Sequence, residues 1–366
     1  MNENSGLHGS SHWPREIPIK GRGAALNPAN RFIPIHYQLD DNLPVEERPS
    51  PRTRFLVDQS RTVLTRNTSP DLPFEYTLNP YRGCEHGCSY CYARPTHEYL
   101  GFSAGLDFET QILVKADAPS LLRQELRQPA WKGELINLSG VTDCYQPIER
   151  QLQLTRQCLQ VIVEFRQACT IVTKNRLITR DVDLLQQLAR HHAVEVSISI
   201  TTLDEELAGR MEPRATRPPG RLEAIRLLAQ AGIPVGLLVA PIIPGLNDHE
   251  IPAILRAARE HGAQFAGSLV LRLPYAIKEL FADWLQQHYP RRKDKVLQRI
   301  RELRDGKLND PRFGSRMRGQ GIWADLFQQQ FALHARRLGY PDRPQPIITS
   351  AFCRPGMKQG TLFDAG

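Results

Sequence analysis

One short stretch decides how this chain is interpreted, and it reads Gly83-Cys84-Glu85-His86-Gly87-Cys88-Ser89-Tyr90-Cys91-Tyr92. Three of the seven cysteines of the 366-residue chain fall within eight residues there, in the spacing C-x3-C-x2-C. Glycines let such a loop turn its sulfurs toward one centre, and soft thiolates favour zinc or iron-sulfur clusters. A cubane cluster normally takes four thiolates. The stretch predicts a cluster bound by Cys84, Cys88 and Cys91, with its fourth iron open to another ligand, because catalytic metal sites keep one position open.

A zinc site is the alternative interpretation of the same loop. His86 or His97 lies close enough in the sequence to supply a fourth ligand. Structural zinc sites usually pair two C-x2-C hooks that are separated by roughly 12 or more residues. The chain has no second hook, because its other cysteines stand alone at Cys144, Cys158, Cys169 and Cys353. The spacing therefore favours an iron-sulfur cluster.

Downstream of an N-terminal region, short apolar runs alternate with amphipathic segments. Strands are expected at residues 74–78, 135–139, 170–173, 194–200, 234–240 and 267–271. Helices are expected at residues 119–126, 152–167, 180–191, 220–231, 251–261 and 277–289. Six β-then-α units in a row predict parallel strands with the helices outside. The expected fold is α/β, a partial (β/α)6 three-quarter TIM-like barrel, whose chemistry lies on the loops after the strands.

Polar side chains follow or line three of the predicted strands. The run 139–147 after the second strand is small and polar, which suits close approach of a ligand. Lys174 follows the third strand, where its ammonium can hydrogen-bond the carboxylate of a cofactor. On the fourth strand, Glu195, Ser197 and Ser199 alternate with apolar residues and therefore share one face. These positions predict a polar ligand site.

Positive charge is concentrated near the C-terminus. The chain has a net charge of +8, and residues 291–366 hold 16 Lys and Arg against 7 Asp and Glu. Residues 291–323 are the densest part of this basic tract, which contains Phe313 and ends at Trp323. Phosphates attract basic patches and aromatic rings stack on bases, so the tract predicts contact with nucleic acid. A solvated helix face is the alternative.

We expect three regions along the chain. Residues 1–73, rich in Pro, Arg and Asn, are expected to form an N-terminal arm over the core. Residues 74–290 form the barrel, and residues 291–366 form the basic C-terminal extension and tail. No run approaches the roughly 18 apolar residues of a membrane span. An odd number of cysteines, three of them in a cluster motif, indicates the reducing cytoplasm.

The cysteine spacing, with the aromatic Tyr90 just before the last cysteine, resembles the signature of the radical S-adenosylmethionine (radical SAM) superfamily. The resemblance implies a 4Fe-4S cluster on the three cysteines, whose open iron chelates the amino and carboxylate groups of S-adenosylmethionine. It also implies a reductant such as flavodoxin or ferredoxin. One electron from the cluster then splits a carbon-sulfur bond, and the resulting 5'-deoxyadenosyl radical abstracts hydrogen from the substrate.

Further motifs narrow the resemblance to the branch of spore photoproduct lyase and the bacterial DNA-repair-photolyase-like proteins. They extend over about residues 74–271 and include Thr142-Asp143, Thr173-Lys174, Glu212-Pro213, Gly220-Arg221-Leu222 and Val239-Ala240-Pro241.

This branch implies a role for each matching residue at the cofactor. Lys174 and Ser197 are expected to bind the carboxylate end of S-adenosylmethionine, Thr142 its polar groups and Ala240 its base. Tyr90, inside the cluster motif, is expected to line the same cofactor site.

The hydrogen donor is where the chain departs from this branch. Spore photoproduct lyase has a hydrogen-donating cysteine two residues before the position of Thr142, where this chain has Gly140. Tyr92 is implied to line the radical path. Cys144, four residues after Gly140, is the candidate replacement thiol, and a small buried cysteine is the alternative.

Near the C-terminus, Gln359-Gly360-Thr361-Leu362-Phe363 resembles the peptides with which bacterial DNA-repair proteins engage the sliding clamp. The favoured function is a radical SAM enzyme that acts on DNA or another nucleic acid in repair or modification. Two alternatives stay open: a non-catalytic zinc or iron-sulfur protein that binds nucleic acid, and a radical enzyme with a protein or small-molecule substrate.

Overall fold

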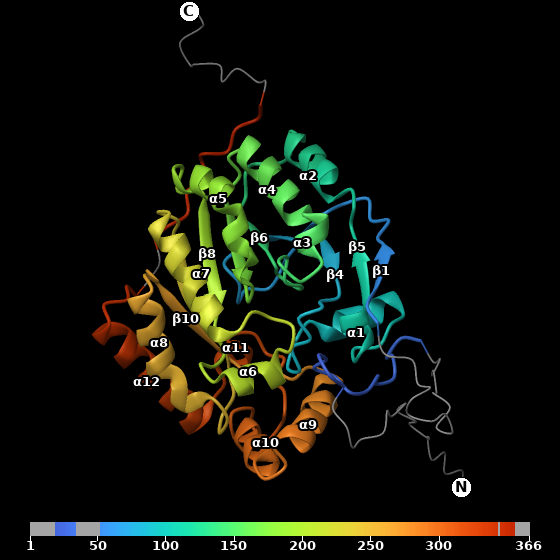
Figure 1. Cartoon of the computed structure of the whole chain (residues 1–366), viewed down its shortest axis with the longest axis vertical. Coiled ribbons are helices and arrows are strands. Elements are labelled where there is room, and N and C mark those ends of the chain that lie inside the picture. Colours follow the sequence, from blue (N-terminus) through green and yellow to red (C-terminus); the bar gives the residue numbers. More distant parts are fainter. Residues whose placement is uncertain (1–18, 34–51, 343–344, 356–366) are drawn as a thin grey trace, which may run out of the picture.

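The computed structural model describes residues 19–33, 52–342 and 345–355. Within these ranges, the largest element is a sheet with the strand order β10-β9-β8-β7-β6-β3-β2 (Figure 1). Its strands are β2 (Leu64–Arg66), β3 (Tyr76–Leu78), β6 (Ile136–Leu138), β7 (Cys169–Thr173), β8 (Val194–Ser199), β9 (Val235–Ile242) and β10 (Ala266–Val270). The strands from β3 to β10 pair in parallel, whereas β2 pairs antiparallel with β3 at the edge. All six strands predicted from the sequence are present.

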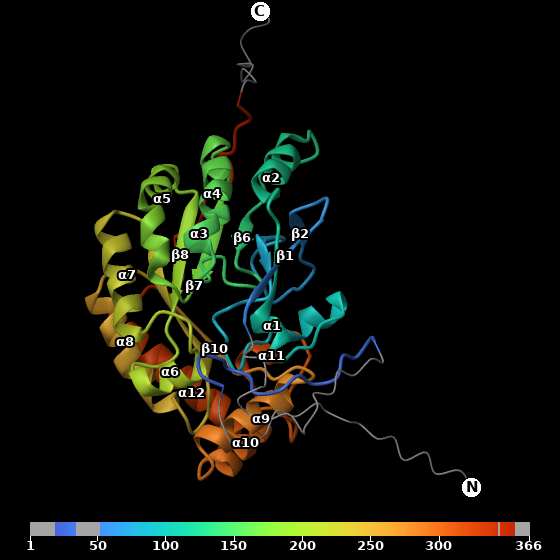
Figure 2. The same ribbon diagram turned by 45° about the vertical axis from the view of Figure 1, so that its right-hand side comes forward.

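The predicted helices follow these strands in the expected order. They are α2 (Ala118–Arg127), α4 (Leu154–Glu164), α5 (Val182–Ala189), α7 (Pro218–Gln230), α8 (Ile251–Glu260) and α9 (Ile277–His288). Helices α4, α5, α7 and α8 cover one side of the sheet (Figures 1 and 2). The predicted α/β class and partial barrel are confirmed, with a mostly parallel sheet that does not close on itself. No helix in the described part of the chain is long and apolar enough to span a membrane.

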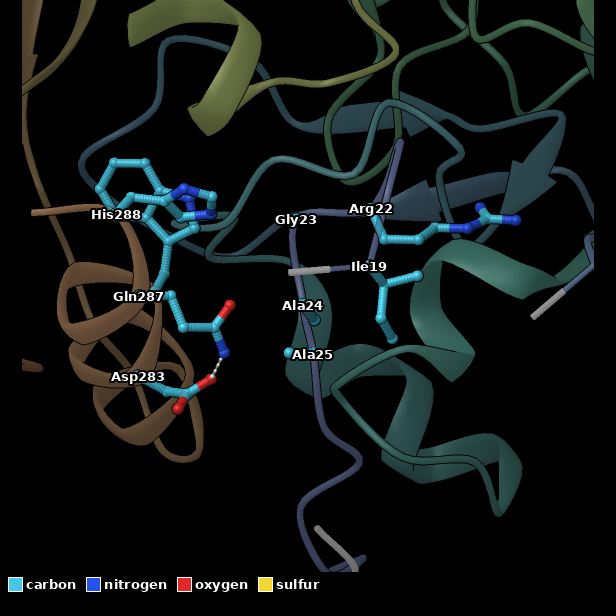
Figure 3. Close-up of a pocket in the computed structure, with 9 residues that line it drawn as sticks. Ile19, Arg22, Gly23, Ala24, Ala25, Asp283, Gln287 and His288 are labelled. Atoms are coloured by element: carbon cyan, nitrogen blue, oxygen red, sulfur yellow. Dashed lines mark hydrogen bonds between the residues drawn. The ribbon is translucent and has the colours of Figure 1, made fainter. Parts of the chain in front are cut away.

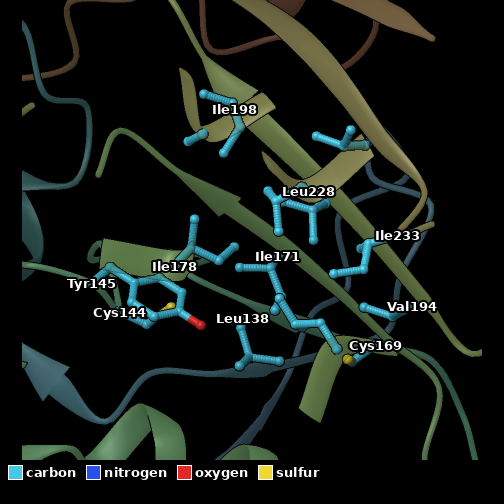
Figure 4. Packing of buried hydrophobic residues seen from close by; sticks show 14 of the residues in the cluster. Leu138, Cys144, Tyr145, Cys169, Ile171, Ile178, Val194, Ile198, Leu228 and Ile233 are labelled. Atoms are coloured by element: carbon cyan, nitrogen blue, oxygen red, sulfur yellow. The ribbon is translucent and has the colours of Figure 1, made fainter. Parts of the chain in front are cut away.

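The main hydrophobic core lies between the sheet and these outer helices. Along β8, Val194, Val196 and Ile198 are buried, whereas Glu195 and Ser197 on the other face are half-buried. Figure 4 shows the buried side chains of neighbouring strands and helices packed together in this layer. Burying each large aliphatic side chain stabilises the fold by about 1.5–3 kcal/mol. The opposite face of the sheet, which carries Glu195 and Ser197, is the inner face of the barrel. It is less buried and is therefore available for polar chemistry.

A second, small sheet has the order β1-β5-β4. Its strands are β1 (Arg54–Val57), β4 (Tyr81–Arg82) and β5 (Gln111–Val114). The sequence analysis missed these strands and β2, because two to four residues are too few to show a periodic pattern. Strands β1 and β2 belong to the region expected to form an N-terminal arm. The described part of that region thus contributes a strand to each sheet.

The basic extension packs on the barrel as three helices, α10 (Lys293–Glu302), α11 (Ser315–Arg318) and α12 (Gly321–Arg337). The buried residues of α10 join α9 in one hydrophobic cluster. Just after α10, the buried Arg304 donates to the backbone oxygens of Leu271 (2.6 Å) and Ser315 (3.0 Å). Part of the positive charge of the tract therefore supports the fold. The sliding-clamp motif at residues 359–363 lies outside the described residues.

Candidate active site

The cysteine loop runs from β4 to the 3-10 helix η2 (Arg94–Leu100). Gly83 and Gly87 turn the loop with φ of +80° and +68°, a region that side chains disfavour. Burial raises the pKa of all three thiols, and the charges of Asp143, Cys88 and Cys91 raise the pKa of Cys84 further. Cys91 packs against the small hydrophobic cluster that contains Cys84, and its amide donates to the backbone oxygen of Cys88 at 3.2 Å.

The segment 19–33 packs over the outside of this loop. A Cβ atom added to Gly23 would lie 1.6 Å from the backbone oxygen of Gly87, so a side chain cannot be accommodated there. The Gly23 amide donates to Glu109 Oε2 at 3.1 Å, and the Glu109 carboxylate pairs with the fully buried guanidinium of Arg94. This contact covers the cysteine loop with a part of the chain that the sequence analysis did not connect to it.

The same segment faces helix α9 across a narrow crevice (Figure 3). Ile19, Gly23 and Ala25 lie on one side and Gln287 and His288 on the other. The crevice contains none of the three cysteines of the loop. It therefore marks where the N-terminal segment meets α9.

Lys174 directly follows β7, at the carboxyl end of the strand. Its Nζ donates to Ser199 Oγ at 3.0 Å, and that hydroxyl donates to the backbone oxygen of Ala240 at 3.1 Å. The same Nζ lies 5.9 Å from the centre of the Tyr90 ring. Burial raises the pKa of the Cys88 thiol, and the charge of Lys174 opposes that rise. Lys174 thus lies between the cysteine loop and the ends of β8 and β9.

The hydroxyl beside Lys174 belongs to Ser199, whereas the sequence analysis selected Ser197. Both serines share the inner face of β8. Ser197 lies two residues farther from the carboxyl end of the strand and pairs with Val172 and Gly236 on the neighbouring strands. The stagger between strands, which the sequence does not reveal, decides which serine reaches the ammonium. A role for Ser197 stays a prediction.

A buried network holds Tyr90 in place. Its hydroxyl donates to the Glu212 carboxylate, which also pairs with the buried guanidinium of Arg221. Burial alone raises the pKa of Glu212, but the charges of Arg221 and Lys174 hold it at about 2. The hydroxyl of Thr201 lies 2.6 Å from the same carboxylate. Glu212 and Arg221 appeared in the sequence as family motifs without a role, because their partners are distant along the chain.

Asp143 joins the cysteine loop to β7. It accepts from the Thr173 hydroxyl and from the Lys174 amide, both at 2.8 Å, and lies 3.4 Å from His86 Nδ1. Burial raises the pKa of Asp143, while the charge of His86 and the hydrogen bonds that the carboxylate accepts hold it at about 2. The ionised carboxylate therefore orients both the loop and the residue that follows β7.

Two other predicted residues hold the loop after β6, Thr142 from within it and Tyr92 from the cysteine loop. The Thr142 hydroxyl donates to the backbone oxygen of Tyr81 at 2.9 Å, which fixes that loop against β4. The Tyr92 hydroxyl donates to the backbone oxygen of Gly140 at 2.8 Å. A Cβ atom at Gly140 would lie 2.7 Å from Thr77 Cγ2. The position of the lyase cysteine is therefore closed to a side chain unless Thr77 moves.

Cys144 lies in the hydrophobic core and is fully buried. Figure 4 shows it beside Tyr145 and Ile178, in the layer between the sheet and the helices. Gln146 and Asp143, on either side of it in the chain, contact the cysteine loop, but the Cys144 thiol itself is enclosed in the hydrophobic core. The placement supports the alternative of a small buried cysteine over a replacement hydrogen donor.

The donor set of the loop fits a 4Fe-4S cluster. Each thiolate of such a cluster binds a different iron, so the sulfurs surround a centre and need not meet at one ion. In the described ranges, no three His, Cys, Asp or Glu side chains are placed to hold a single metal ion. The two histidines considered for zinc already have protein partners: His86 Nε2 lies 3.2 Å from Asn175 Nδ2, and His97 Nε2 lies 2.9 Å from the Gln111 oxygen.

The fold and the site define a radical SAM enzyme, and comparisons with known proteins agree. A model of the radical SAM superfamily matches residues 78–258. Rv2578c, an uncharacterized protein of Mycobacterium tuberculosis, is 35% identical over 295 residues, which are 80% of this chain and 83% of that protein. MJ0683, an uncharacterized protein of Methanocaldococcus jannaschii, is 32% identical over 176 residues, 48% of this chain and 63% of that protein.

Among solved structures, spore photoproduct lyase complexed with dinucleoside spore photoproduct has a TM-score of 0.57 and 18% identity, over 78% of this chain and 79% of that chain. A mutant of the lyase with bound AdoMet has a TM-score of 0.56. This likeness shows a shared fold. The chain belongs to the radical SAM superfamily, as its cysteine stretch predicts, and its cofactors are those of the family, a 4Fe-4S cluster and S-adenosylmethionine.

Proposed function

We propose that this enzyme cleaves S-adenosylmethionine at a cluster held by Cys84, Cys88 and Cys91 and directs the resulting radical at a nucleic acid. The observation that carries the proposal is the position of the Lys174 ammonium at the carboxyl ends of parallel strands, 3.0 Å from Ser199 Oγ and 5.9 Å from the centre of the Tyr90 ring inside the cysteine motif. Barrels of this kind carry their chemistry at that end.

The residues around Lys174 form the proposed site for S-adenosylmethionine. The Lys174 ammonium binds the carboxylate of the cofactor, because a charge-assisted hydrogen bond is stronger than a neutral one. Ser199 orients that ammonium, and Ala240 packs against the adenine. Tyr90, held by Glu212, closes the side next to the cluster.

When bound, the cluster and S-adenosylmethionine would supply the radical chemistry that abstracts hydrogen from the substrate, with one electron provided by a carrier such as flavodoxin or ferredoxin. The protein binds and orients the reactants and excludes water. Tyr92, directly after the last cluster cysteine, lines the path to the substrate. Its hydroxyl is held by Gly140, so the ring has a defined position.

The return of hydrogen to the substrate is expected to differ from that in spore photoproduct lyase. Gly140 carries no thiol, and Cys144 is enclosed in the core. The proposed reaction is therefore a hydrogen abstraction in nucleic-acid repair or modification, without the lyase cysteine.

A nucleic-acid substrate is supported by the charge of the chain. Its C-terminal extension is basic, and Arg291, Arg292, Lys295 and Arg301 are exposed on or beside α10. The spore photoproduct lyase structure that shares the fold is complexed with a dinucleoside. A protein or small molecule is the second candidate substrate, since radical SAM enzymes are defined by their cofactor.

The test is anaerobic reconstitution of the full chain with iron and sulfide, followed by dithionite and S-adenosylmethionine. We expect 5'-deoxyadenosine from the wild type and none from Cys88→Ala. Addition of damaged or single-stranded DNA is expected to raise the yield. A protein that binds one zinc ion and forms no 5'-deoxyadenosine would overturn the proposal. If only a protein extract raised the yield, the substrate would be a protein and not a nucleic acid.

A further inference from the structure

Four aromatic side chains, one of them directly after the last cysteine of the loop, are exposed at the surface. Phe32, Tyr92, Tyr99 and Tyr275 have exposed fractions of 52%, 48%, 72% and 59%. Tyr92 and Tyr99 follow the cysteine loop, and Tyr275 lies between β10 and α9. Scattered exposed rings are ordinary, but a contiguous group of them marks a binding surface.

These rings are joined by direct contacts. Phe32 and Tyr99 stack with their ring centres 4.7 Å apart. The guanidinium carbon of Arg31 lies 4.9 Å from the centre of the Phe32 ring and 3.6 Å from that of Tyr275. Three segments that are distant in the sequence thus build one continuous stack on the surface.

The segment that carries Tyr275 extends this stack to the cysteine loop. Three residues before Tyr275, the guanidinium carbon of Arg272 lies 5.2 Å from the centre of the Tyr92 ring. Tyr92 directly follows a cluster cysteine. We call the whole set the Arg-aromatic strip, and it consists of Arg31, Phe32, Tyr92, Tyr99, Arg272 and Tyr275. Figures 1 and 2 show α1 (Asp107–Thr110), α9 and α11, which adjoin these segments, at the same end of the molecule.

Arg272 lacks a partner of opposite charge within the described residues. No carboxylate there lies within 4 Å of it, its buried Nε has no hydrogen-bond partner, and one terminal nitrogen reaches Met317 Sδ at 3.4 Å. Burial and the neighbouring charge of Arg316 lower the pKa of Arg272. The charge of Asp71, which pairs with Arg316, opposes this fall in part, and an anion at this point would satisfy the Nε of Arg272.

Beyond Arg272, the strip continues onto α11. Phe313 is 59% exposed, and the Arg316 guanidinium carbon lies 4.5 Å from the centre of its ring. Arg316 is held by Asp71 at 2.5 Å. Arginine and exposed aromatic side chains thus alternate from Tyr99 to the basic extension.

We propose that the Arg-aromatic strip binds an unpaired nucleic-acid strand and leads one nucleotide past Tyr92 to the cysteine loop. Bases stack on the rings, and a phosphate binds at Arg272. Arg31, which pairs with the buried Glu98 at 2.8 Å, holds the Phe32 and Tyr275 rings in place. An exposed ring can stack only on a base whose face is open. In a duplex the neighbouring base pairs cover that face, so the strip should bind single strands more tightly. This inference rests on the proposed function and names its substrate class.

An acidic electron carrier is the other partner that a basic, aromatic surface attracts. The Arg-aromatic strip fits a substrate better than a carrier, because it ends at Tyr92 beside the predicted cluster cysteines. The substrate must come that close for its hydrogen atom to be abstracted, whereas a carrier only transfers an electron. A carrier needs charge complementarity more than a row of stacking faces.

The test measures binding of a fluorescently labelled single-stranded DNA 15-mer to the reconstituted full chain by anisotropy, with the matching duplex in parallel. We expect the single strand to bind more tightly. Tyr99→Ala and Tyr275→Ala are each expected to weaken it roughly tenfold, the usual effect of one lost stacking face. Tyr275→Phe is expected to keep the affinity, because the ring remains. Phe55→Ala, which removes a 45% exposed ring from β1 outside the strip, is the matched control and is expected to change nothing.

Three results would overturn the inference. The first is a duplex that binds as tightly as the single strand, and the second is tyrosine variants that bind like the wild type. The third is variants that slow cluster reduction by flavodoxin without any change in DNA affinity. The last result would assign the strip to the carrier. Formation of 5'-deoxyadenosine by the wild type with dithionite in the same preparation reports on the proposed function separately.

Discussion

Lys174 is the residue whose removal is expected to weaken cofactor binding most directly. Lys174→Met deletes the ammonium beside Ser199 and Tyr90 but keeps much of the volume of the side chain. A hydrogen bond between charged groups contributes about 1.5–3 kcal/mol, so the Kd for S-adenosylmethionine should rise roughly 10- to 150-fold. Calorimetric titration of the reconstituted protein measures this change. Ser199→Ala, which removes only the orienting hydroxyl, should have a smaller effect, and an unchanged Kd in Lys174→Met would exclude the assigned role.

Glu212 is expected to contribute to stability in a pH-dependent manner. Its pKa is about 2 in the folded chain, below the ordinary value of 4.5. The carboxylate therefore stabilises the fold above pH 4.5, and this contribution disappears as the pH falls toward 2. Glu212→Gln leaves the buried guanidinium of Arg221 uncompensated and should cost about 3–5 kcal/mol at pH 7.

Urea unfolding of the two proteins between pH 7 and pH 3 tests this expectation. The difference in unfolding free energy between the wild type and Glu212→Gln should shrink as the pH is lowered. Glu223→Gln is the control, because Glu223 pairs with Arg226 on the exposed face of α7. A difference that stays constant with pH would contradict the assignment.

At the scale of elements, the N-terminal segment 19–33 is a cover for the cysteine loop. Gly23→Ala would place a methyl group 1.6 Å from the Gly87 oxygen, so the segment or the loop must move. We expect faster loss of the cluster absorbance in air, by several-fold, because water and oxygen gain access. Gly267→Ala is the matched control, since its nearest neighbour, Leu238, lies at an ordinary 3.5 Å. Equal rates of bleaching in the two variants would show that the segment does not protect the cluster.

At the scale of the whole molecule, the basic extension is part of the fold. A chain that ends at residue 290 loses α10, whose Val296, Leu297 and Ile300 are buried against α9. These three side chains alone contribute about 5–9 kcal/mol, a large share of the 5–15 kcal/mol by which a domain is stable. The truncated chain should be insoluble or unfold without a cooperative transition. A soluble product with an unchanged Tm would make the extension a separate unit.

The β-α series and the cysteine loop could be predicted because their signals are local. Strand and helix periods repeat within a dozen residues, and the three cluster cysteines lie within eight. The strands before residue 74 could not be predicted, because each is too short for a period and is stabilised by a distant partner. The contact between Ser199 and Lys174 could not be predicted for a related reason: alternation identifies the face of a strand, but not the depth at which a side chain meets its neighbour.

The sequence by itself determined the α/β class, the order of the six β-α units and the superfamily, and it predicts the three cluster cysteines. Tertiary structure alone decided that Ser199 meets Lys174, that Arg221 and Glu212 hold Tyr90, and that Gly23 seals the loop. It also decided that Arg31, Tyr99 and Tyr275 form one surface. The physical reason is that these contacts join residues far apart in the chain, and their distances depend on how the strands stagger and how the segments cross.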